Sequence, residues 1–310
     1  MCAFPMLFFA QEPQKVNIQS GLLEKRPDFP DAVIYTKNRN EQVYIVHEGV
    51  EMWCDQAFVY MKDNFVKAFG NVRITQGDTM TLNSKYAEYN GNTQFAFASG
   101  DVILKEPNTT LTTDTLYFDR IKQQGFYRSG GKVVDTASVL TSRIGRYFAE
   151  TKKYQFLSNV VLTHPDYVIN TNQLDFYTES GHAYLYGPST ITGETSVVYS
   201  ERGFYDTRSD KGYFMRNARI DYDNRTVFGD SLYFDRNKNF ASATNNIKIL
   251  DTLNNSLVRG HYAEVFREKD SVFITKRAVA ITVRDNDSTY VHADTLRITG
   301  KPEHRILKGF

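Results

Sequence analysis

The segment Asp114-Thr115-Leu116-Tyr117-Phe118-Asp119-Arg120 returns almost unchanged as Asp230-Ser231-Leu232-Tyr233-Phe234-Asp235-Arg236. The two copies are 116 residues apart, which is four times 29. Close similarity between distant segments indicates an internal repeat, and a period of about 29 residues is typical of stacked repeat architectures. We therefore expect the same pattern at other multiples of this period.

A register set on these two segments gives nine repeat starts, all of them apolar. The starts are Met52, Leu82, Leu111, Leu140, Ile169, Val198, Val227, Val258 and Val291. The fifth residue after each start is small or apolar: Ala57, Ala87, Leu116, Gly145, Leu174, Gly203, Leu232, Ala263 and Leu296. The seventh is a β-former: Val59, Tyr89, Phe118, Tyr147, Phe176, Tyr205, Phe234, Val265 and Ile298. Because side chains two positions apart share one face of a strand, both rows lie on the same side of a sheet.

A second strand is predicted before most of the following repeats. Its apolar residues alternate with polar neighbours: Val72/Ile74, Val102/Leu104, Val160/Leu162, Ile220/Tyr222, Ile247/Ile249 and Val279/Ile281. Turn sequences such as Asn90-Gly91 separate the strands, so each repeat is predicted to hold about two strands of roughly five to eight residues. The start of a repeat and the fifth residue after it are an odd number of positions apart, so a regular strand would place them on opposite faces. Both are apolar, which requires a bulge or corner between them and predicts a curved sheet.

Such a repeat cannot bury its apolar face alone, because the other face carries Lys, Arg, Asp and Thr, so neighbouring repeats must stack. The sequence favours an all-β fold: an elongated, twisted β-jelly-roll, open as a trough, built from about nine ~29-residue two-strand repeats. A parallel β-helix is the alternative. It is less favoured because turn signals join successive short strands, and because neither an Asn ladder nor a Ca²⁺-binding Gly-Asp repeat is present.

The composition agrees with a folded β-protein and excludes several partners. Hydrophobic residues make up 41% of the chain and aromatic residues 14%, with 20 Tyr and 22 Phe, which suit half-buried strands. The net charge of +1 provides no field that would attract nucleic acid, so no nucleic-acid partner is expected. Cys2 and Cys54 are too few for a disulfide framework or a structural zinc site.

Three segments are expected along the chain. Residues 1–10 are nearly all apolar, like the remnant of a signal peptide, although they lack a basic start; an apolar N-terminal strand is the alternative. Residues 11–40, which contain three prolines, are predicted to be a leader or linker. Residues 41–310 form the repeat domain. No apolar run approaches the ~20 residues of a membrane-spanning helix, so the mature chain is expected to be soluble.

Several repeats share a strand of the type Gly-Asn-Val-x-Ile and a following Leu-x-x-(Asp/Asn)-x-Leu-x-Phe/Tyr-Asp. The matching segments are Gly70-Asn71-Val72-Arg73-Ile74, Leu111 to Asp119, Ile169 to Phe176 and Val227 to Asp235. In this succession, over roughly residues 45–300, the chain resembles the LptA/OstA family of lipopolysaccharide transport proteins. The resemblance implies a twisted, open β-jelly-roll whose interior carries lipid A acyl chains across the periplasm of a double-membraned bacterium. This chain has more repeats than a short carrier of that family.

The resemblance further implies an exported periplasmic carrier that is not an enzyme and needs no cofactor. The implied partners are lipopolysaccharide or lipid A, and like-folded transport proteins of the inner and outer membranes at the two ends. Head-to-tail self-association is a further expectation, because an open stack leaves unpaired strand edges. The acyl chains would contact the inward rows: Ala87, Tyr89, Leu116, Phe118, Gly145, Tyr147, Leu174, Phe176, Gly203, Tyr205, Leu232, Phe234, Val102, Leu104, Val160, Leu162, Ile220, Ile247 and Ile249.

A closed core is the alternative for these residues, because inward aromatic side chains usually fill a core. Two other function classes stay open from the sequence. A β-helix surface protein or carbohydrate-active enzyme would show carboxylates clustered on one exposed face. An adhesin-like stalk would need a solid core and no groove.

Catalytic and metal-binding patterns are weak. The six histidines occupy different repeat positions without ligand spacing, so no metal site is expected. The pairs Asp114/Asp119 and Asp230/Asp235 could mimic the carboxylates of a glycosidase, but turn and capping roles at strand ends fit them better. Lys152-Lys153, Arg143/Arg146 and Arg216/Arg219 could contact lipid phosphates, isolated solvent-face charges being the alternative.

Overall fold

The computed structural model describes residues 17–47, 49–222, 224–269, 271–284, 287–301 and 304–310, so the predicted signal-peptide remnant 1–10 lies outside the described residues. Within these ranges the chain forms 25 β-strands and two short 3-10 turns. None of the helical pieces described is long and apolar enough to cross a membrane. The chain divides into two compact units, Met1–Ser158 and Asn159–Phe310.

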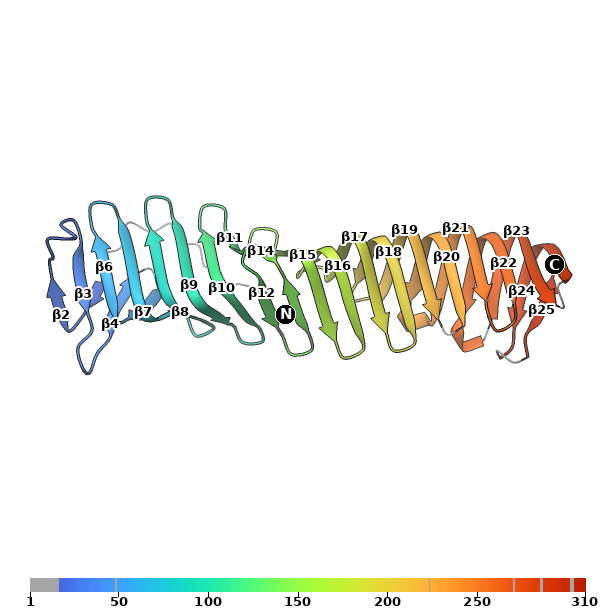
Figure 1. Cartoon of the computed structure of the whole chain (residues 1–310), viewed down its shortest axis with the longest axis horizontal. Coiled ribbons are helices and arrows are strands. Elements are labelled where there is room, and N and C mark those ends of the chain that lie inside the picture. The colour runs from blue at the N-terminus through green and yellow to red at the C-terminus, as the bar shows by residue number, and fades with distance from the viewer. Residues whose placement is uncertain (1–16, 48, 223, 270, 285–286, 302–303) are drawn as a thin grey trace. The chain divides into compact units, whose positions relative to one another are not determined.

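The strands of the first unit (Figure 1) are β1 (Asn17–Gln19), β2 (Leu22–Glu24), β3 (Val33–Thr36), β4 (Val43–His47), β5 (Val50–Cys54), β6 (Gln56–Tyr60), β7 (Phe65–Gln76), β8 (Met80–Asn90), β9 (Phe95–Lys105), β10 (Thr110–Asp119), β11 (Gln124–Tyr127), β12 (Gly131–Val134), β13 (Val139–Ser142), β14 (Ile144–Phe148) and the first part of β15 (Lys153–His164). Three of these strands, β1 to β3, lie in the segment 11–40, where the sequence pattern predicted no strand. Several neighbouring strands of the first unit are not consecutive in the chain: β1 pairs with β4, β3 with β6 and β5 with β7.

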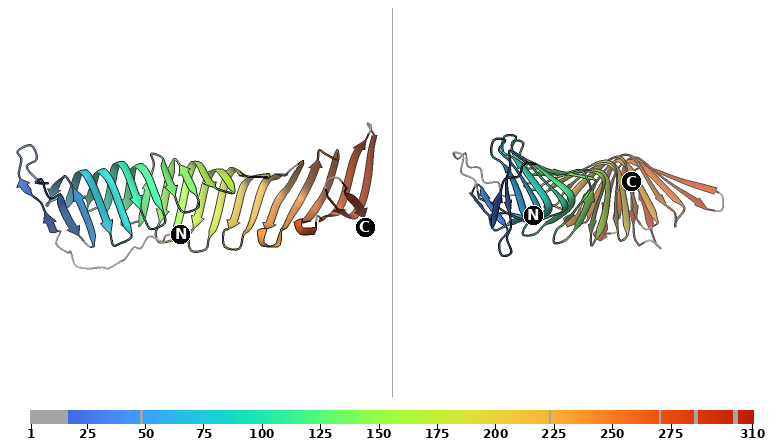
Figure 2. Two further views of the ribbon diagram at one scale, coloured as in Figure 1. Left: turned by 90° about the horizontal axis from the view of Figure 1, so that it is seen from below. Right: turned by 60° about the vertical axis from the view of Figure 1, so that its left-hand side comes forward.

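The second unit continues with β16 (Tyr167–Tyr177), β17 (His182–Gly193), β18 (Ser196–Asp206), β19 (Lys211–Tyr222), β20 (Arg225–Asp235), β21 (Phe240–Asp251), β22 (Ser256–Phe266), β23 (Ser271–Arg284), β24 (Asp287–Thr299) and β25 (Ile306–Gly309). The turns η1 (Arg236–Lys238) and η2 (Arg267–Lys269) lie between strands of this unit. In both views of Figure 2, neighbouring strands within a unit run alongside each other.

Each long strand contributes to two layers. In the first unit, residues 65–69 of β7 pair with β6 and with residues 86–90 of β8, whereas residues 73–76 pair with β5. The first set of pairings continues through β3, β9, β10, β11 and β14, and we call it layer A. The second set continues through β4, β12 and β13, and we call it layer B. Long strands thus cross from one layer to the other.

The crossing occurs at a β-bulge in which two residues oppose one. In β7, Gly70 and Asn71 oppose Lys85 of β8, and both bulge residues have positive φ angles, 71° and 45°. The same pair of left-handed residues recurs in the second unit at Arg216-Asn217, Asn245-Asn246 and Lys276-Arg277. Two successive left-handed residues bend the strand sharply. The bulge predicted from the odd spacing in the sequence is therefore confirmed, and it recurs along the chain.

Every strand pairing found in the described residues is antiparallel, which rules out the parallel β-helix and agrees with the jelly-roll prediction. The strands differ from the prediction in length. From β16 to β24 they have 11 to 14 residues instead of five to eight. The reason is that each bulge bends a strand without ending it, so the two strands of a repeat, such as β8 and β9, each continue through the bend.

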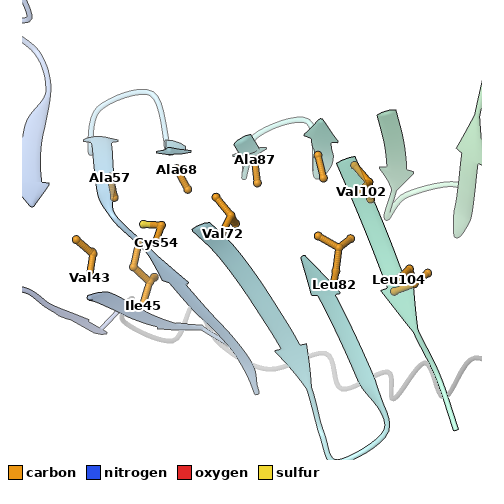
Figure 3. Packing of buried hydrophobic residues seen from close by; sticks show 11 residues of the cluster. Val43, Ile45, Cys54, Ala57, Ala68, Val72, Leu82, Ala87, Val102 and Leu104 are labelled. Carbon is orange, nitrogen blue, oxygen red and sulfur yellow. The ribbon is translucent and has the colours of Figure 1, made fainter. Parts of the chain in front are cut away.

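The apolar core of the first unit lies between its two layers. Figure 3 shows the side chains of Ala57 and Ala68 in layer A directed toward Ile45 in layer B. Val72 and Val102, the first residues after two bulges, are 1% exposed and lie in the same cluster. Burial of apolar side chains between the layers is the main stabilising contribution that such a stack offers.

Candidate functional site

The side of each layer that faces the other layer is called here the inner face. Its side chains follow the strand alternation from the buried positions beside the bulges: Ala87 and Tyr89 share one side of β8, as Leu232 and Phe234 do in β20. The predicted fifth-position and seventh-position rows both lie on this face. In each unit, therefore, the inner face is an almost uninterrupted apolar surface.

Exposure on the inner face increases with distance from the bulge in most repeats, Val59 and Tyr147 being buried exceptions at the seventh position. At the fifth position of the repeat, Ala87, Leu174 and Leu232 are 5%, 4% and 2% exposed. At the seventh position, the aromatic side chains of Phe118, Phe176 and Phe234 are only half-buried. The two layers thus form a closed core beside the bulges and have an accessible rim near the hairpin turns.

The predicted site residues are divided between the two units. The first unit holds Ala87, Tyr89, Leu116, Phe118, Gly145, Tyr147, Val102 and Leu104, and the second holds Leu174, Phe176, Gly203, Tyr205, Leu232, Phe234, Val160, Leu162, Ile220, Ile247 and Ile249. Within these sets the half-buried residues are Tyr89, Leu116, Phe118, Leu162, Phe176, Tyr205, Ile220 and Phe234. The others are buried. A ligand could therefore contact the half-buried subset without rearrangement of the core.

The two glycines of the fifth-position row are covered by neighbouring side chains. The ring of Tyr127 lies over Gly145 and occupies the space that a side chain there would need. At Gly203, Leu185 and Phe214 lie 3.1 Å and 3.3 Å from the position of a Cβ atom. These glycines accommodate large neighbours, a requirement that the sequence pattern alone did not reveal.

A row of small residues at the second position of the repeat supports the bend. It consists of Cys54, Ser84, Thr113, Ser142, Thr171, Ser200, Gly229 and Gly260, all buried. The hydroxyls of Ser84, Ser142 and Thr171 donate to the carbonyl oxygen two residues further on, at 3.0 to 3.2 Å. Each such bond satisfies polar groups at the point where the strand bends. The regular Ser/Thr spacing in the sequence could have predicted this row.

Two titratable groups on the inner side are held in their neutral forms. Burial and the neighbouring charge of Asp210 raise the pKa of Tyr205 to about 12, and its hydroxyl donates to Asp210 Oδ1 at 2.6 Å. Burial, followed by the charge of Asp55, raises the pKa of the Cys54 thiol to about 12. Neutral groups are compatible with an apolar face, because a buried charge would be costly there.

The outer face differs from the sequence interpretation, which expected mainly Lys, Arg, Asp and Thr. In the first unit a ladder of rings runs across it: Phe58, Phe69, Tyr86, Phe97, Tyr117 and Phe126, with centroids 4.9 to 6.0 Å apart. In the second unit Phe204, Tyr213 and Tyr233 continue in the same manner. Cross-strand aromatic pairs of this kind stabilise sheets. The prediction rested on the inward rows, and the ladder residues occupy the positions between them.

The paired aspartates have structural roles. Asp119 Oδ1 accepts from the backbone N–H of Lys122 at 3.0 Å, and Asp235 caps η1 by accepting from the N–H of Lys238. Asp230 accepts from the bulge residue Asn246 at 3.0 Å. The predicted capping role is confirmed for the two strand-end residues. Over the described ranges, no group of three or more His, Cys, Asp or Glu side chains could hold a metal ion.

The four arginines that the sequence suggested for lipid phosphates do not lie on the inner face. Arg146 alternates with Gly145 and Tyr147, and Arg219 alternates with Ala218 and Ile220, so both lie on the outer face. Arg143 and Arg216 are exposed at the bends. None of the four arginines is placed to contact an amphiphile between the layers.

Comparison with known proteins identifies one family. The sequence profile of a family described as OstA-like protein matches residues 23–172. No curated protein matches the chain. One similar solved structure is LptH from Pseudomonas aeruginosa, described as the LptA homologous periplasmic component of the conserved lipopolysaccharide transport device. It shares 15% sequence identity, the alignment covers 44% of this chain and 82% of that chain, and the TM-score is 0.22.

Proposed function

We propose, from the match of the OstA-like protein family to residues 23–172, that this chain belongs to that family and is a periplasmic carrier of lipopolysaccharide. In this proposal the inner face shields the acyl chains of lipid A during transport toward the outer membrane. In this proposal the chain, like its proposed family, is not an enzyme. Its proposed role is therefore to bind and release lipopolysaccharide.

The observation that supports the proposal best is the graded exposure of the inner face. Each methylene of an acyl chain costs about 0.8 kcal/mol in water, so a chain of a dozen methylenes needs extended apolar cover. The half-buried rim aromatics Phe118, Phe176 and Phe234 recur at a constant position of the repeat. Their recurrence offers a lipid similar contacts at successive positions in each unit. A lipid could therefore move along the face without meeting one position that binds it much more tightly than the others.

The proposed partners are lipopolysaccharide and like-folded transport proteins that extend the sheet. Apolar residues are exposed at strands near both chain ends: Leu22 and Leu23 of β2 are 55% and 59% exposed, and Ile306 of β25 is 56% exposed. Unpaired strand edges are the usual sites of β-augmentation. Components of the inner and outer membranes, or further copies of this chain in a head-to-tail arrangement, would pair there.

The experiment is mass spectrometry of lipids that co-purify with the chain from a lipopolysaccharide-containing envelope. The inner-face variant Phe234→Asp should lose lipopolysaccharide, because a charge on the rim disfavours acyl chains. The neighbouring outer-face variant Tyr233→Asp is the matched control and should retain it. Absence of lipid from a folded wild-type protein would contradict the proposal and favour a closed-core stalk.

A further inference from the structure

Two arginines and one aspartate meet at the rim of the inner face in the second unit. Asp251, the last residue of β21, pairs with Arg225, the first residue of β20. Arg225 Nε lies 3.4 Å from Asp251 Oδ2, and Arg305 Nη1 lies 3.5 Å from the same oxygen. The side chains of Arg225, Arg305 and Asp251 are 20%, 19% and 8% exposed. The group is therefore largely shielded from water.

This group joins the two layers. Residues 247–251 of β21 belong to the half that follows the bulge at Asn245-Asn246. Arg305 immediately precedes β25, which pairs with residues 296–299 of β24, in the half on the other side of the bulge in that strand pair. The ion pair between Asp251 and Arg305 thus spans the space between the layers at the rim.

The group is continuous with the apolar inner face. By strand alternation Asp251 shares its side of β21 with Ile247 and Ile249, and Arg225 shares its side of β20 with Val227. An amphiphile with its tail along Ile249 and Val227 would place its head beside the two arginines. The spatial order, apolar inside and cationic at the rim, matches the order within an anionic lipid.

The charges are unbalanced in favour of an anion. Asp251 is the only carboxylate that pairs with either arginine in the part of the chain that the structure describes. Asp251 already accepts from the backbone N–H and the side-chain amide of Asn254, at 3.1 and 3.0 Å, and from Asn224. The Nε of Arg305 is buried and has no hydrogen-bond partner. Among the residues that the structure describes, one positive charge of this group and one buried donor therefore have no partner.

We propose that Arg225 and Arg305 form a binding site for the phosphate headgroup of an anionic amphiphile whose tail lies on the inner face. Guanidinium groups bind phosphate through charge-assisted, often bidentate hydrogen bonds. Asp251 contacts both arginines and would compete with the ligand for them. The proposal rests on the proposed carrier function, because it names the headgroup site of the same inner face.

The experiment measures binding of two amphiphiles with the same tail to the lipid-free full-length protein by isothermal titration calorimetry. The probes are dodecyl phosphate and dodecyl maltoside, with inorganic phosphate as a competitor. The wild type should bind dodecyl phosphate about tenfold or more tightly than dodecyl maltoside. The double variant Arg225→Gln/Arg305→Gln should lose this preference and keep its affinity for dodecyl maltoside. Arg259→Gln, which changes an exposed outer-face arginine of the same unit, is the matched control.

The variant Asp251→Asn gives a test of opposite sign. Removal of the competing carboxylate should strengthen binding of dodecyl phosphate, whereas damage to the fold would weaken binding of both amphiphiles. Equal affinity of the wild type for both probes, or an unchanged preference in the double variant, would overturn the headgroup site and leave the carrier proposal standing. Inorganic phosphate that binds as tightly as dodecyl phosphate would also overturn it, in favour of a free-phosphate site. Binding of neither amphiphile would overturn both proposals.

Discussion

The ring of Tyr127 packs directly over Gly145, and its hydroxyl lies 2.7 Å from Ser142 Oγ. The two residues face each other across the pairing of β11 with β14. Tyr127 is 3% exposed, so the ring cannot move into solvent without opening the core. A glycine is therefore required at this position for packing.

Replacing Gly145 with alanine should lower the free energy of unfolding by about 1–3 kcal/mol, because the added methyl group overpacks the core against the Tyr127 ring. The measurement is the shift of the urea midpoint of the first unfolding transition. Gly125→Ala is the matched control in β11: its Cβ would meet atoms only at 3.7 Å and beyond, so the change should be near neutral or stabilising. Equal midpoints for Gly145→Ala and wild type would refute the packing account.

Arg216 occupies a left-handed conformation, with φ of 62°, in the bulge of β19. Because asparagine tolerates this conformation better than arginine, Arg216→Asn should raise the free energy of unfolding by roughly 0.5–1 kcal/mol. It would create the Asn-Asn pair already present at Asn245-Asn246. The thermal unfolding midpoint checks this, and a lower midpoint would show that the Arg216 side chain contributes more than its backbone costs.

Stability should fall at alkaline pH partly through Tyr205. Burial and the charge of Asp210 raise its pKa to about 12 in the folded protein, compared with about 10 in an unfolded chain. Since the folded state holds this proton more tightly, its contribution is fully present below pH ~10 and is lost as the pH rises toward 12. Urea midpoints measured from pH 9 to 12 should fall less steeply for Tyr205→Phe. An identical slope would contradict the assignment to this residue.

The free edge of β25 should control association with a like-folded partner. Thr295 and Phe310 exchange backbone hydrogen bonds at 3.2 and 2.9 Å, so by alternation the N–H of Leu307 points away from β24. Leu307→Pro should weaken self-association without disturbing the β24 pairing, as measured by sedimentation velocity. Leu307→Ala keeps the N–H and is the control. Association that is unchanged in the proline variant would exclude this edge as the contact.

The repeat in the sequence was sufficient to predict the all-β class, the antiparallel stack and the inward rows, because burial imposes a strict alternation on those residues. It also predicted a bulge, but it did not locate the bulge, since the two bulge residues lie on the opposing strand. Pairs such as Gly70-Asn71 and Asn245-Asn246 carry that information, because these residue types favour positive φ.

The rim group of Arg225, Asp251 and Arg305 could not be predicted from the repeat. It depends on a contact between Arg305, just before β25, and Asp251, two residues far apart in sequence. The outer aromatic ladder could have been found, because Tyr117 and Tyr233 occupy the same repeat position between two inward residues. Alternation alone cannot show whether such a residue faces solvent or another ring.

Site-specific photo-crosslinking tests the central claim most directly. A photoreactive phenylalanine analogue at the inner-face position of Phe118 or Tyr205 should crosslink lipopolysaccharide, whereas the same analogue at the adjacent outer-face position of Tyr117 or Phe204 should not. Crosslinking that follows this alternation would place the lipid between the layers. Crosslinking at outer-face positions alone, or at none of the four in a folded protein, would contradict the account.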